Sequence, residues 1–586
     1  MKLIKHAHTQ PFNFSIHLVV LFIFIIQVNS YSQNLENISE QTPVKLTGGA
    51  SLNMSFYHSS DSVGRRGPFS YTIAGSPTLS LYGITMPFSF IYSDEASSFS
   101  QPFSQFGISP YYKWIKLHLG YSNVSFSPFT LAGHTFFGGG IELTPGILRF
   151  GFVYGRFQKA IPEDTQQGYD TLLYNPPLPA YKRKAYAIKL GIGSEKNYLD
   201  LIYMKGKDDS TSLPSRPADY YLTPGEDAVL GISYKITIAK KVTWKTDAAV
   251  SLYTTDMGTQ SLDVEDFPLF DALSTIIKPN ISTQVLTAGE SSLAYKDRYF
   301  GLQLKYRRID PDYKSMGVYY FQTDLEQYTI APTFNLFKFK LMINSSIGYQ
   351  RDNLYNRKLS TSARKIGSLN INLNASQKFG INFQYSNYGI TQNPALARRM
   401  PDSTYHRYDS LLISQVSQNI VLSPRLNFNT DNCLHAFNLF VGYQALSDNN
   451  KNTRAYSEMK SINVNLSYNL LFLKNKFTLT SALLYNSAKT QPGLLQNVGG
   501  TISTNKPFLK NALYTNASLS FTKNYFRNAG NGYTLSLTWA LTIKPFKSDK
   551  QGFTINAQWM KNRATDQVLT RDFSEFTGTF GYNINF

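Results

Sequence analysis

Apolar and polar residues alternate at every second position over most of this chain. The last eleven residues show the pattern most clearly. One face of an extended strand would carry Phe576, Phe580, Tyr582, Ile584 and Phe586, whereas the other face would carry Thr577, Thr579, Asn583 and Asn585. A period of two predicts β-strands that each have one apolar and one polar face.

The alternation continues across short turns, which predicts antiparallel hairpins. In the clearest hairpin, residues 371–385, aliphatic and aromatic residues alternate with asparagines on both sides of a turn at 377–380. The same pattern spans residues 232–244, with a turn at 239–241, and it returns at 462–485 and 533–559. Asparagine-rich faces are too polar for a soluble core, so we expect them to face water.

Tight turns alternate with long connections, and this favours a transmembrane barrel with its long loops outside the cell. The long connections are Pro162–Pro179, Asp208–Glu226, Asp256–Gln284 and Thr391–Ser410. We count roughly 24 to 26 strands and expect an even number. The predicted fold is all-β: a single-domain, antiparallel transmembrane β-barrel over residues 45–586, without a plug domain. Strands and turns are hardest to separate at Gly107–Val124 and Asn497–Ser520.

The N-terminus has the pattern of a secretory signal peptide over residues 1–32. Lys2 and Lys5 precede an apolar run at 16–26, and small residues follow at Ser30 and Ser32. The run is about half of the ~20 residues that a membrane-spanning helix needs. Without a cysteine near the cleavage site, a lipid-anchored N-terminus is excluded. We expect residues 33–44 to be a short periplasmic segment.

Composition agrees with an exported barrel. The mean hydropathy of -0.25 would suit a soluble protein, but alternation makes lipid-facing and water-facing residues cancel in any average. The 40 Tyr and 41 Phe would supply the aromatic girdles at the two membrane interfaces. A single cysteine, Cys433, excludes an intramolecular disulfide and a cysteine-based metal site. For an exported barrel, the net charge of +19 suggests contact with lipopolysaccharide and anionic solutes instead of nucleic acid.

If the apolar residues face lipid, the polar face of the same strands carries a basic set in the lumen. Its predicted members are Lys189, Lys235, Lys245, Lys305, Arg307 and Lys340, with few acids such as Asp247. Cations around a water-filled lumen favour anionic solutes. The alternative is that these are solvated wall residues paired with loop carboxylates.

The long connection Asp256–Gln284 contains a predicted short helix. Asp266 would cap it, Pro268 would begin it and Pro279 would end it. This loop either folds into the lumen as a constriction or lies on the barrel rim. Its acidic residues do not have the spacing of a calcium loop, so we expect a solvated acidic loop. They are Asp263, Glu265, Asp266 and Asp271.

Other candidate motifs have structural explanations. Residues 309–313 with Gly317 form a sharp loop that turn chemistry explains. Gly138, Gly139 and Gly140 lack the Gly-Lys-Ser/Thr of a phosphate loop and indicate a strand bend or close packing. The histidines outside the signal peptide belong to no recognisable nucleophile motif, so we expect no enzyme, cofactor or metal. They are His58, His118, His134, His406 and His435.

The C-terminus resembles that of outer-membrane β-barrel proteins of Gram-negative bacteria, whose final strand commonly ends in Phe. The resemblance implies that the barrel-assembly machinery reads Phe580, Tyr582, Ile584 and Phe586 as an insertion signal. The Tyr/Asn-rich strands, with Gln33 following the signal peptide, look like large outer-membrane proteins of the Bacteroidota. Energy-coupled nutrient receptors have an N-terminal plug, for which residues 33–45 are too short.

An open pore of this size would endanger the membrane barrier, and natural barrels of about 22 strands are plugged. Inward loops, a partner protein or a passenger in transit must therefore close it. We expect a transport or export channel in the outer membrane, gated by its loops or by a partner protein. The alternative is a structural or surface-interaction barrel, a scaffold or an adhesin, with a filled lumen.

Overall fold

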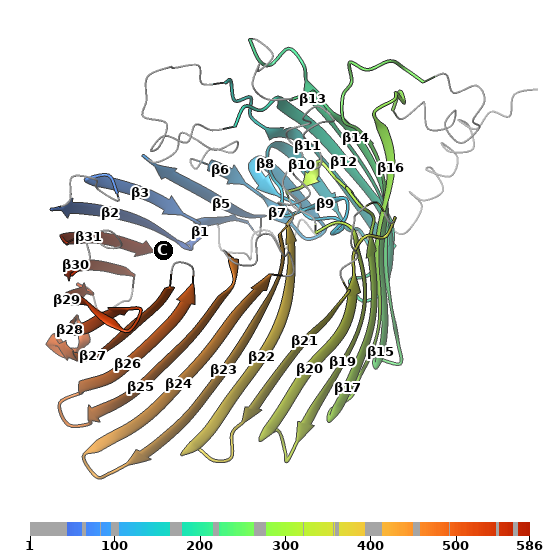
Figure 1. Ribbon diagram of the computed structural model, residues 1–586. Coiled ribbons are helices and arrows are strands. Elements are labelled where there is room, and N and C mark those ends of the chain that lie inside the picture. The colour runs from blue at the N-terminus through green and yellow to red at the C-terminus, as the bar shows by residue number, and fades with distance from the viewer. Residues whose placement is uncertain are drawn as a thin grey trace, which may run out of the picture.

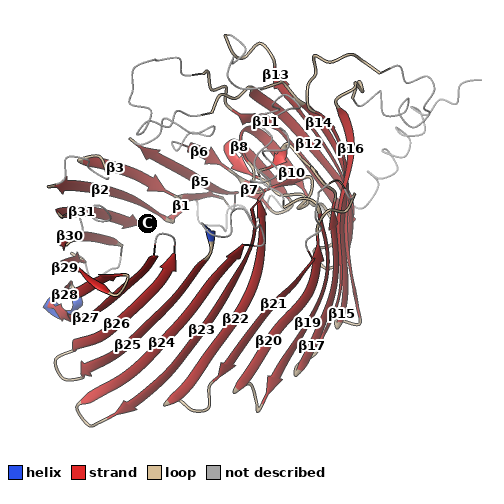
Figure 2. Ribbon diagram, viewed as in Figure 1, coloured by secondary structure: helices blue, strands red, loops and turns tan. Residues whose placement is uncertain are grey.

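The computed structural model describes residues 44–60, 66–82, 84–94, 105–163, 178–214, 222–262, 277–319, 322–355, 357, 363–392, 413–448, 457–490, 493–545, 550–565 and 572–586. Antiparallel strands make up most of these residues (Figure 2). Within these residues, no helix is long and apolar enough to cross a membrane. The 3-10 turn η4 (Leu509–Asn511) joins two strands.

The first half of the chain contains β1 (Val44–Thr47), β2 (Gly49–Ser59), β3 (Phe69–Gly75), β4 (Thr78–Leu81), β5 (Ile84–Ser93), β6 (Gln105–Ile108), β7 (Tyr111–Tyr112), β8 (Ile115–Asn123), β9 (Leu131–Ala132), β10 (Thr135–Leu143), β11 (Leu148–Gln158), β12 (Lys182–Gly193), β13 (Tyr198–Asp209), β14 (Glu226–Ile238), β15 (Val242–Thr254) and β16 (Thr283–Lys296). The second half contains β17 (Phe300–Ile309), β18 (Gly317–Val318), β19 (Leu325–Leu336), β20 (Leu341–Arg351), β21 (Ala363–Leu373), β22 (Phe379–Gln392), β23 (Ile413–Asn429), β24 (Cys433–Asp448), β25 (Met459–Phe472), β26 (Phe477–Thr490), β27 (Gly493–Phe508), β28 (Leu513–Phe526), β29 (Ala529–Ile543), β30 (Gln551–Arg563) and β31 (Phe573–Asn585).

The strands form one closed antiparallel barrel of 26 strands, which is the upper end of the predicted range. Three barrel strands are interrupted and consist of two short strands each, namely β1 with β2, β3 with β4, and β6 with β7. Closure comes from β31, which pairs with β2 from Gly49↔Asn585 to Ser59↔Glu575. Figure 1 accordingly shows the first strands, in blue, beside the last strands, in dark red.

The predicted hairpins are confirmed with their register. Asn372 pairs with Asn382 and Ile371 with Phe383, so asparagines meet on one face and apolar residues on the other. Between β14 and β15, Ala239 and Lys240 have φ of 50° and 59°. Positive φ at the first two of the three turn residues, 239–241, matches the twist of a tight hairpin. The two regions in which strands and turns were hard to separate, 107–124 and 497–520, also form barrel strands.

Connection length sorts to the two ends over most of the barrel, as predicted, but the two-residue connections β26–β27 and β28–β29 lie at the end that carries the longer ones. The tight turns β12–β13, β14–β15 and β16–β17 lie at one end, with Gly49 of β2 and Asn585 of β31. The longer connections, including β11–β12, β13–β14 and β15–β16, lie at the other end. The outer face is apolar: Leu201, Leu483 and Ile502 are 57%, 65% and 58% exposed. Such a belt on a closed barrel is stable only in a bilayer.

Two chain segments depart from the barrel wall and enter the interior. Residues 124–134 lie between β8 and β10, and residues 310–319 follow β17. Although β11 to β16 separate them around the wall, the segments meet in the small parallel sheet of β9 and β18. The interior of the barrel is therefore partly occupied by its own chain.

Candidate functional site

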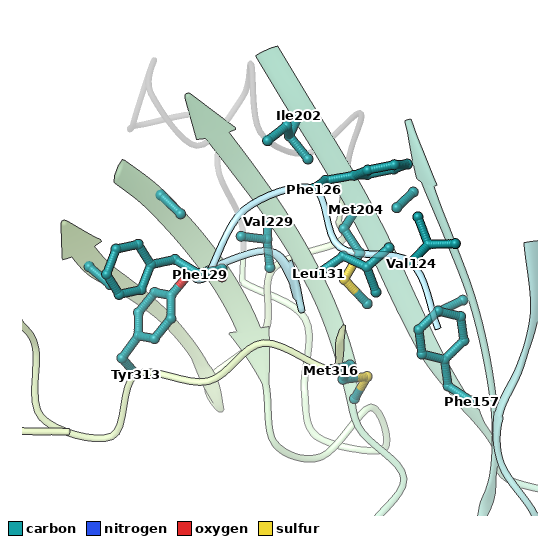
Figure 3. Close-up of a cluster of buried hydrophobic side chains, with 14 of the residues drawn as sticks. Val124, Phe126, Phe129, Leu131, Phe157, Ile202, Met204, Val229, Tyr313 and Met316 are labelled. Carbon is teal, nitrogen blue, oxygen red and sulfur yellow. Dashed lines mark hydrogen bonds between the residues drawn. The ribbon is translucent and has the colours of Figure 1, made fainter. Parts of the chain in front are cut away.

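The two inner segments, defined as residues 124–134 and 310–319, hold the largest apolar cluster of the described chain. Phe129, Leu131 and Tyr313 are almost fully buried, at 1%, 0% and 1% exposure. Figure 3 shows both segments converging on the strands behind them. The cluster takes its wall residues from β10 to β19, namely Phe136, Val153, Phe157, Ala185, Ala187, Ile202, Met204, Val229, Ala249, Leu286, Ala288, Ile309 and Leu325. Burial of each large side chain contributes roughly 1.5–3 kcal/mol, so the segments are firmly attached.

Hydrogen bonds join the inner segments to each other. Tyr313 donates its hydroxyl to the Phe129 carbonyl at 2.7 Å, and Ser315 donates to the Thr130 carbonyl at 2.5 Å. Gly317 lies directly against the first segment, because a Cβ there would be 2.5 Å from the Thr130 carbonyl oxygen. Only glycine permits this approach.

Buried carboxylates fix the second segment to the wall. Asp227 of β14, 1% exposed, accepts the Met316 backbone N–H at 2.7 Å and the Ser251 hydroxyl at 2.9 Å. Asp310 accepts the Thr287 backbone N–H at 2.8 Å and its hydroxyl at 2.5 Å. Truncating Asp227 would leave the buried Met316 N–H and Ser251 hydroxyl unpaired.

At the edge of the cluster, His134 stacks on Tyr319, with ring centroids 3.9 Å apart, and contacts the Thr135 carbonyl at 3.0 Å. Burial, followed by the repulsion of Arg183, lowers the pKa of His134 to about 4. Burial also raises the pKa of Tyr313 above its ordinary value. Both side chains are therefore neutral near pH 7.

The wall near the inner segments carries charges of both signs. Glu142 of β10 contacts His118, Lys116 and Lys189 at 3.0, 3.5 and 3.8 Å. Ser109 contacts the other ring nitrogen of His118, Nδ1, at 3.1 Å. This is the reverse of a Ser-His-Asp triad, in which the base faces Ser through Nε2. The two contacts satisfy a buried imidazole inside an ion cluster.

Four of the six predicted lumen-facing basic residues have carboxylate neighbours. Besides the Lys189 contact, Lys245 pairs with Asp247 at 2.9 Å, and Lys305 and Arg307 approach Glu290 at 2.7 and 3.8 Å. Arg149 with Asp200 and Arg183 with Asp208 form further pairs at 2.7 Å each. The carboxylates belong to barrel strands, whereas the pairing hypothesis had placed them in loops.

The remaining two basic residues lie apart from this group. Lys235 of β14 reaches the Glu195 carbonyl, in the turn between β12 and β13, at 3.4 Å. Lys340 belongs to the turn between β19 and β20, at the end of the wall. The six residues therefore do not form one cationic ring, and their net field is weakened by nearby carboxylates.

The strand register shows which residues share the face of the apolar cluster. Leu325 of β19 belongs to the cluster, so Gln327 and Thr333 on the same strand also face inward. Thr333 pairs with a residue of the next strand, which pairs with a residue of the strand after it, and direct partners across neighbouring strands face the same side. In order, these partners are Asn344, Asn370, Gln384, Val421, Gly442, Asn463, Asn486, Asn497 and Asn524.

Beyond Asn524 the row continues through hydrogen bonds. The Asn524 amide donates to Thr534 at 3.0 Å, and Thr534 donates to Asn562 at 2.8 Å. We call the amides of this row the amide track. Its members are Asn344, Asn370, Gln384, Asn463, Asn486, Asn497, Asn524 and Asn562. The track begins near the tight-turn end of β20 and reaches the other end of the barrel on β30.

This half of the inner wall is polar but nearly uncharged. Among the described side chains of β22–β31, the inward charged ones are Arg425, Asp448 and Glu575, all towards the strand ends. Gln384 and Asn419 are exposed and most of the track is half-buried. Inward Phe440 is 42% exposed. No inner segment of the described chain buries this wall.

Several predicted features lie outside the described residues. The acidic residues Asp263, Glu265, Asp266 and Asp271, the helix from Pro268 and His406 fall in segments that are not described. His435 contacts the Tyr468 hydroxyl at 2.8 Å, and His58 is exposed. Within the described chain, no group of three or more His, Cys, Asp or Glu could hold a metal ion.

The predicted assembly residues lie on the closing strand. Phe580, Tyr582 and Ile584 pair with residues of β2 and β30, and the Phe586 backbone N–H donates to the Gly48 carbonyl at 2.9 Å. Phe586 itself is 40% exposed. These residues help close the barrel, and their role as an insertion signal stays a prediction.

The inner segments were not recognised from the sequence. The sequence predicts only a turn at residues 309–313, whereas Tyr313 anchors the interior cluster. A signal was present: Phe126, Phe129 and Leu131 do not fit the alternation, and a solvated loop has no need of three large apolar residues.

No family model and no curated protein matches the sequence. Among solved structures, the FrpB iron transporter from Neisseria meningitidis (F5-1 variant) is 10% identical, with a TM-score of 0.40, over 94% of this chain and 84% of that one. The P pilus usher (PapC) translocation pore is 10% identical, with a TM-score of 0.37, over 92% and 100%. The copper transporter OprC is 8% identical, with a TM-score of 0.39, over 92% and 80%. At these values the likeness is one of general architecture.

Proposed function

We propose that this protein is an outer-membrane channel that moves a hydrophilic solute or chain. Two inner segments narrow its lumen from one side, and cargo passes along the opposite wall. The supporting observation is the contrast between the two halves of the inner face. One half is covered by an apolar cluster, whereas the other carries amides and hydroxyls that keep contact with solvent.

The inner segments act in this proposal as a fixed constriction. An apolar cluster, a segment-to-segment sheet and buried carboxylates attach them to the wall, so moving them would expose apolar surface and unpaired donors. Gating therefore belongs to the long loops at the same end of the barrel or to a partner protein. We also propose that the barrel contacts lipopolysaccharide and the assembly machinery, and that the protein is exported through a signal peptide.

Single-channel conductance in a planar bilayer tests the proposal. We expect discrete conductance steps from the native protein. Phe129→Ala combined with Tyr313→Ala should increase the step size, because it loosens the constriction. Phe440→Ala is the matched control, since this aromatic faces inward outside the cluster and its loss should leave the constriction intact.

Silence from native and loosened protein, shown to be folded by heat-dependent gel mobility, would contradict a channel. That result would favour a scaffold or an adhesin with a filled lumen. Equal steps from all three proteins would contradict the inner segments as the constriction.

A further inference from the structure

We propose that the amide track is the path of an uncharged glycan chain. This proposal rests on the proposed channel function. The track joins the two ends of the barrel on the wall that the inner segments leave uncovered. A line of amides between the two openings, interrupted at Val421 and Gly442, suits an elongated cargo better than a compact solute. The chemistry of the groups then selects the cargo.

The track is made of carboxamides, and a carboxamide offers a donor and an acceptor side by side. Neighbouring hydroxyls of a sugar also present donors and acceptors, so each amide can bind one ring without a charge. A neutral hydrogen bond is worth only about 0.5–1.5 kcal/mol net. Weak repeated contacts of this size hold a chain in place while allowing it to slide.

The spacing of the track also favours a glycan. Asn463, Asn486, Asn497 and Asn524 are direct partners on four adjacent strands. Adjacent strands lie about 4.7–4.9 Å apart, which is close to the length of one ring in an extended, β-linked glycan. An extended peptide advances by about 3.3–3.6 Å per residue, so its repeat does not follow the amides.

The surrounding charges argue against an ionic cargo. An acidic polymer would need free cations along its path, but Lys245, Lys305 and Arg307 have wall carboxylates as neighbours and lie on the other half of the wall. In β22–β31 the described inward charges, Arg425, Asp448 and Glu575, are few and of both signs. Neither an anionic nor a cationic chain finds a continuous partner there.

The test is equilibrium dialysis of the full-length protein in detergent with labelled cellohexaose, a neutral β-linked oligosaccharide. Hexagalacturonate and a Gly-Ser peptide of similar length serve as the acidic and peptide probes. We expect saturable binding of cellohexaose and at least tenfold weaker binding of the other two. Tighter binding of hexagalacturonate or the peptide, or no saturable binding of any probe, would overturn the proposal.

Variants locate the site. Asn486→Ala with Asn497→Ala should weaken cellohexaose binding roughly tenfold, the loss expected for two neutral hydrogen bonds. Asn583→Ala removes an inward amide of β31 outside the track and should change binding less than twofold. Asn486→Gln with Asn497→Gln keeps the amides and should restore most of the affinity. Equal losses in the track and control variants would place the sugar elsewhere and overturn the assignment.

Conductance of the same preparations separates the two proposals. Ion conductance without sugar binding would overturn the glycan path and leave the channel standing. Sugar binding without any conductance would overturn the channel, and the glycan would then be a ligand of a closed barrel.

Discussion

At the scale of single residues, we expect charge pairing to control the ion preference of the proposed channel. Glu290 is close to both Lys305 and Arg307, so Glu290→Gln would release two cations into the lumen. We expect the chloride-to-potassium permeability ratio to rise about two- to threefold, because uncompensated cations concentrate anions. Reversal potentials in a KCl gradient measure this permeability ratio. Glu575→Gln is the control, since Glu575 accepts a hydrogen bond from Tyr57; an equal rise in both variants would contradict the pairing.

A second residue-scale prediction concerns the two faces of β29. Leu537 is 46% exposed on the apolar outer face, whereas Thr538 pairs with Gln558 on the inner face. Leu537→Arg should block assembly, at a cost of about 2–4 kcal/mol if it lies near the bilayer midplane. Thr538→Arg should assemble normally. The amount of heat-modifiable barrel in membranes measures both, and equal damage would show that the faces are wrongly assigned.

At the scale of elements, Asp227 attaches the second inner segment. Asp227→Ala should leave the Met316 N–H and the Ser251 hydroxyl without their acceptor, at a cost of about 1–3 kcal/mol. Tryptic cleavage after Lys314 in the folded barrel should therefore accelerate. Asp209→Ala is the control, because that exposed carboxylate binds Thr211 of its own turn. Unchanged cleavage in the Asp227 variant would show that the apolar cluster alone holds the segment.

The first inner segment should loosen in acid. The pKa of His134 is about 4 when the side chain is buried, against 6.5 when it is free. The released state binds the proton more readily, so attachment is strongest above pH 6.5 and weakens as the pH falls towards 4. His134→Phe should remove this part of the acid sensitivity, whereas His58→Phe should not. Channel conductance between pH 7 and pH 4 measures it, and identical profiles for both variants would contradict the role of His134.

At the scale of the whole molecule, the barrel depends on closure between its first and last strands. Deletion of Phe586 removes a backbone hydrogen bond to Gly48 and the aromatic end of β31. We expect less inserted barrel, measured as heat-modifiable protein in the outer-membrane fraction. Phe586→Tyr keeps the ring and the N–H and should insert normally. Full insertion after the deletion would contradict the role of the C-terminus as an insertion signal.

The register of the hairpins could be predicted because it is local. Asn372 and Asn382 flank a short turn, and a shift by one residue would put Ile371 and Phe383 on the polar face. The amide track was only partly predictable. The asparagine-rich faces were visible in the sequence, but their alignment across β20 to β30 depends on the register of every strand between.

The inner segments required the tertiary structure. Phe129 and Tyr313 are far apart in the sequence and join through the lumen, which exists only after the barrel closes. The partners of Lys245, Lys305 and Arg307 were likewise fixed by strand neighbours. The identity of these carboxylates could not be read from alternation alone.

The sequence by itself determined an all-β barrel, its approximate strand number, its two faces and the position of most of its long connections. Each follows from a period of two and from turn chemistry, which act over a few residues. Only the tertiary structure decided that the lumen has an occupied side and a free side, and that amides align between its ends. These properties arise from contacts between distant residues, and no local pattern in the chain specifies them.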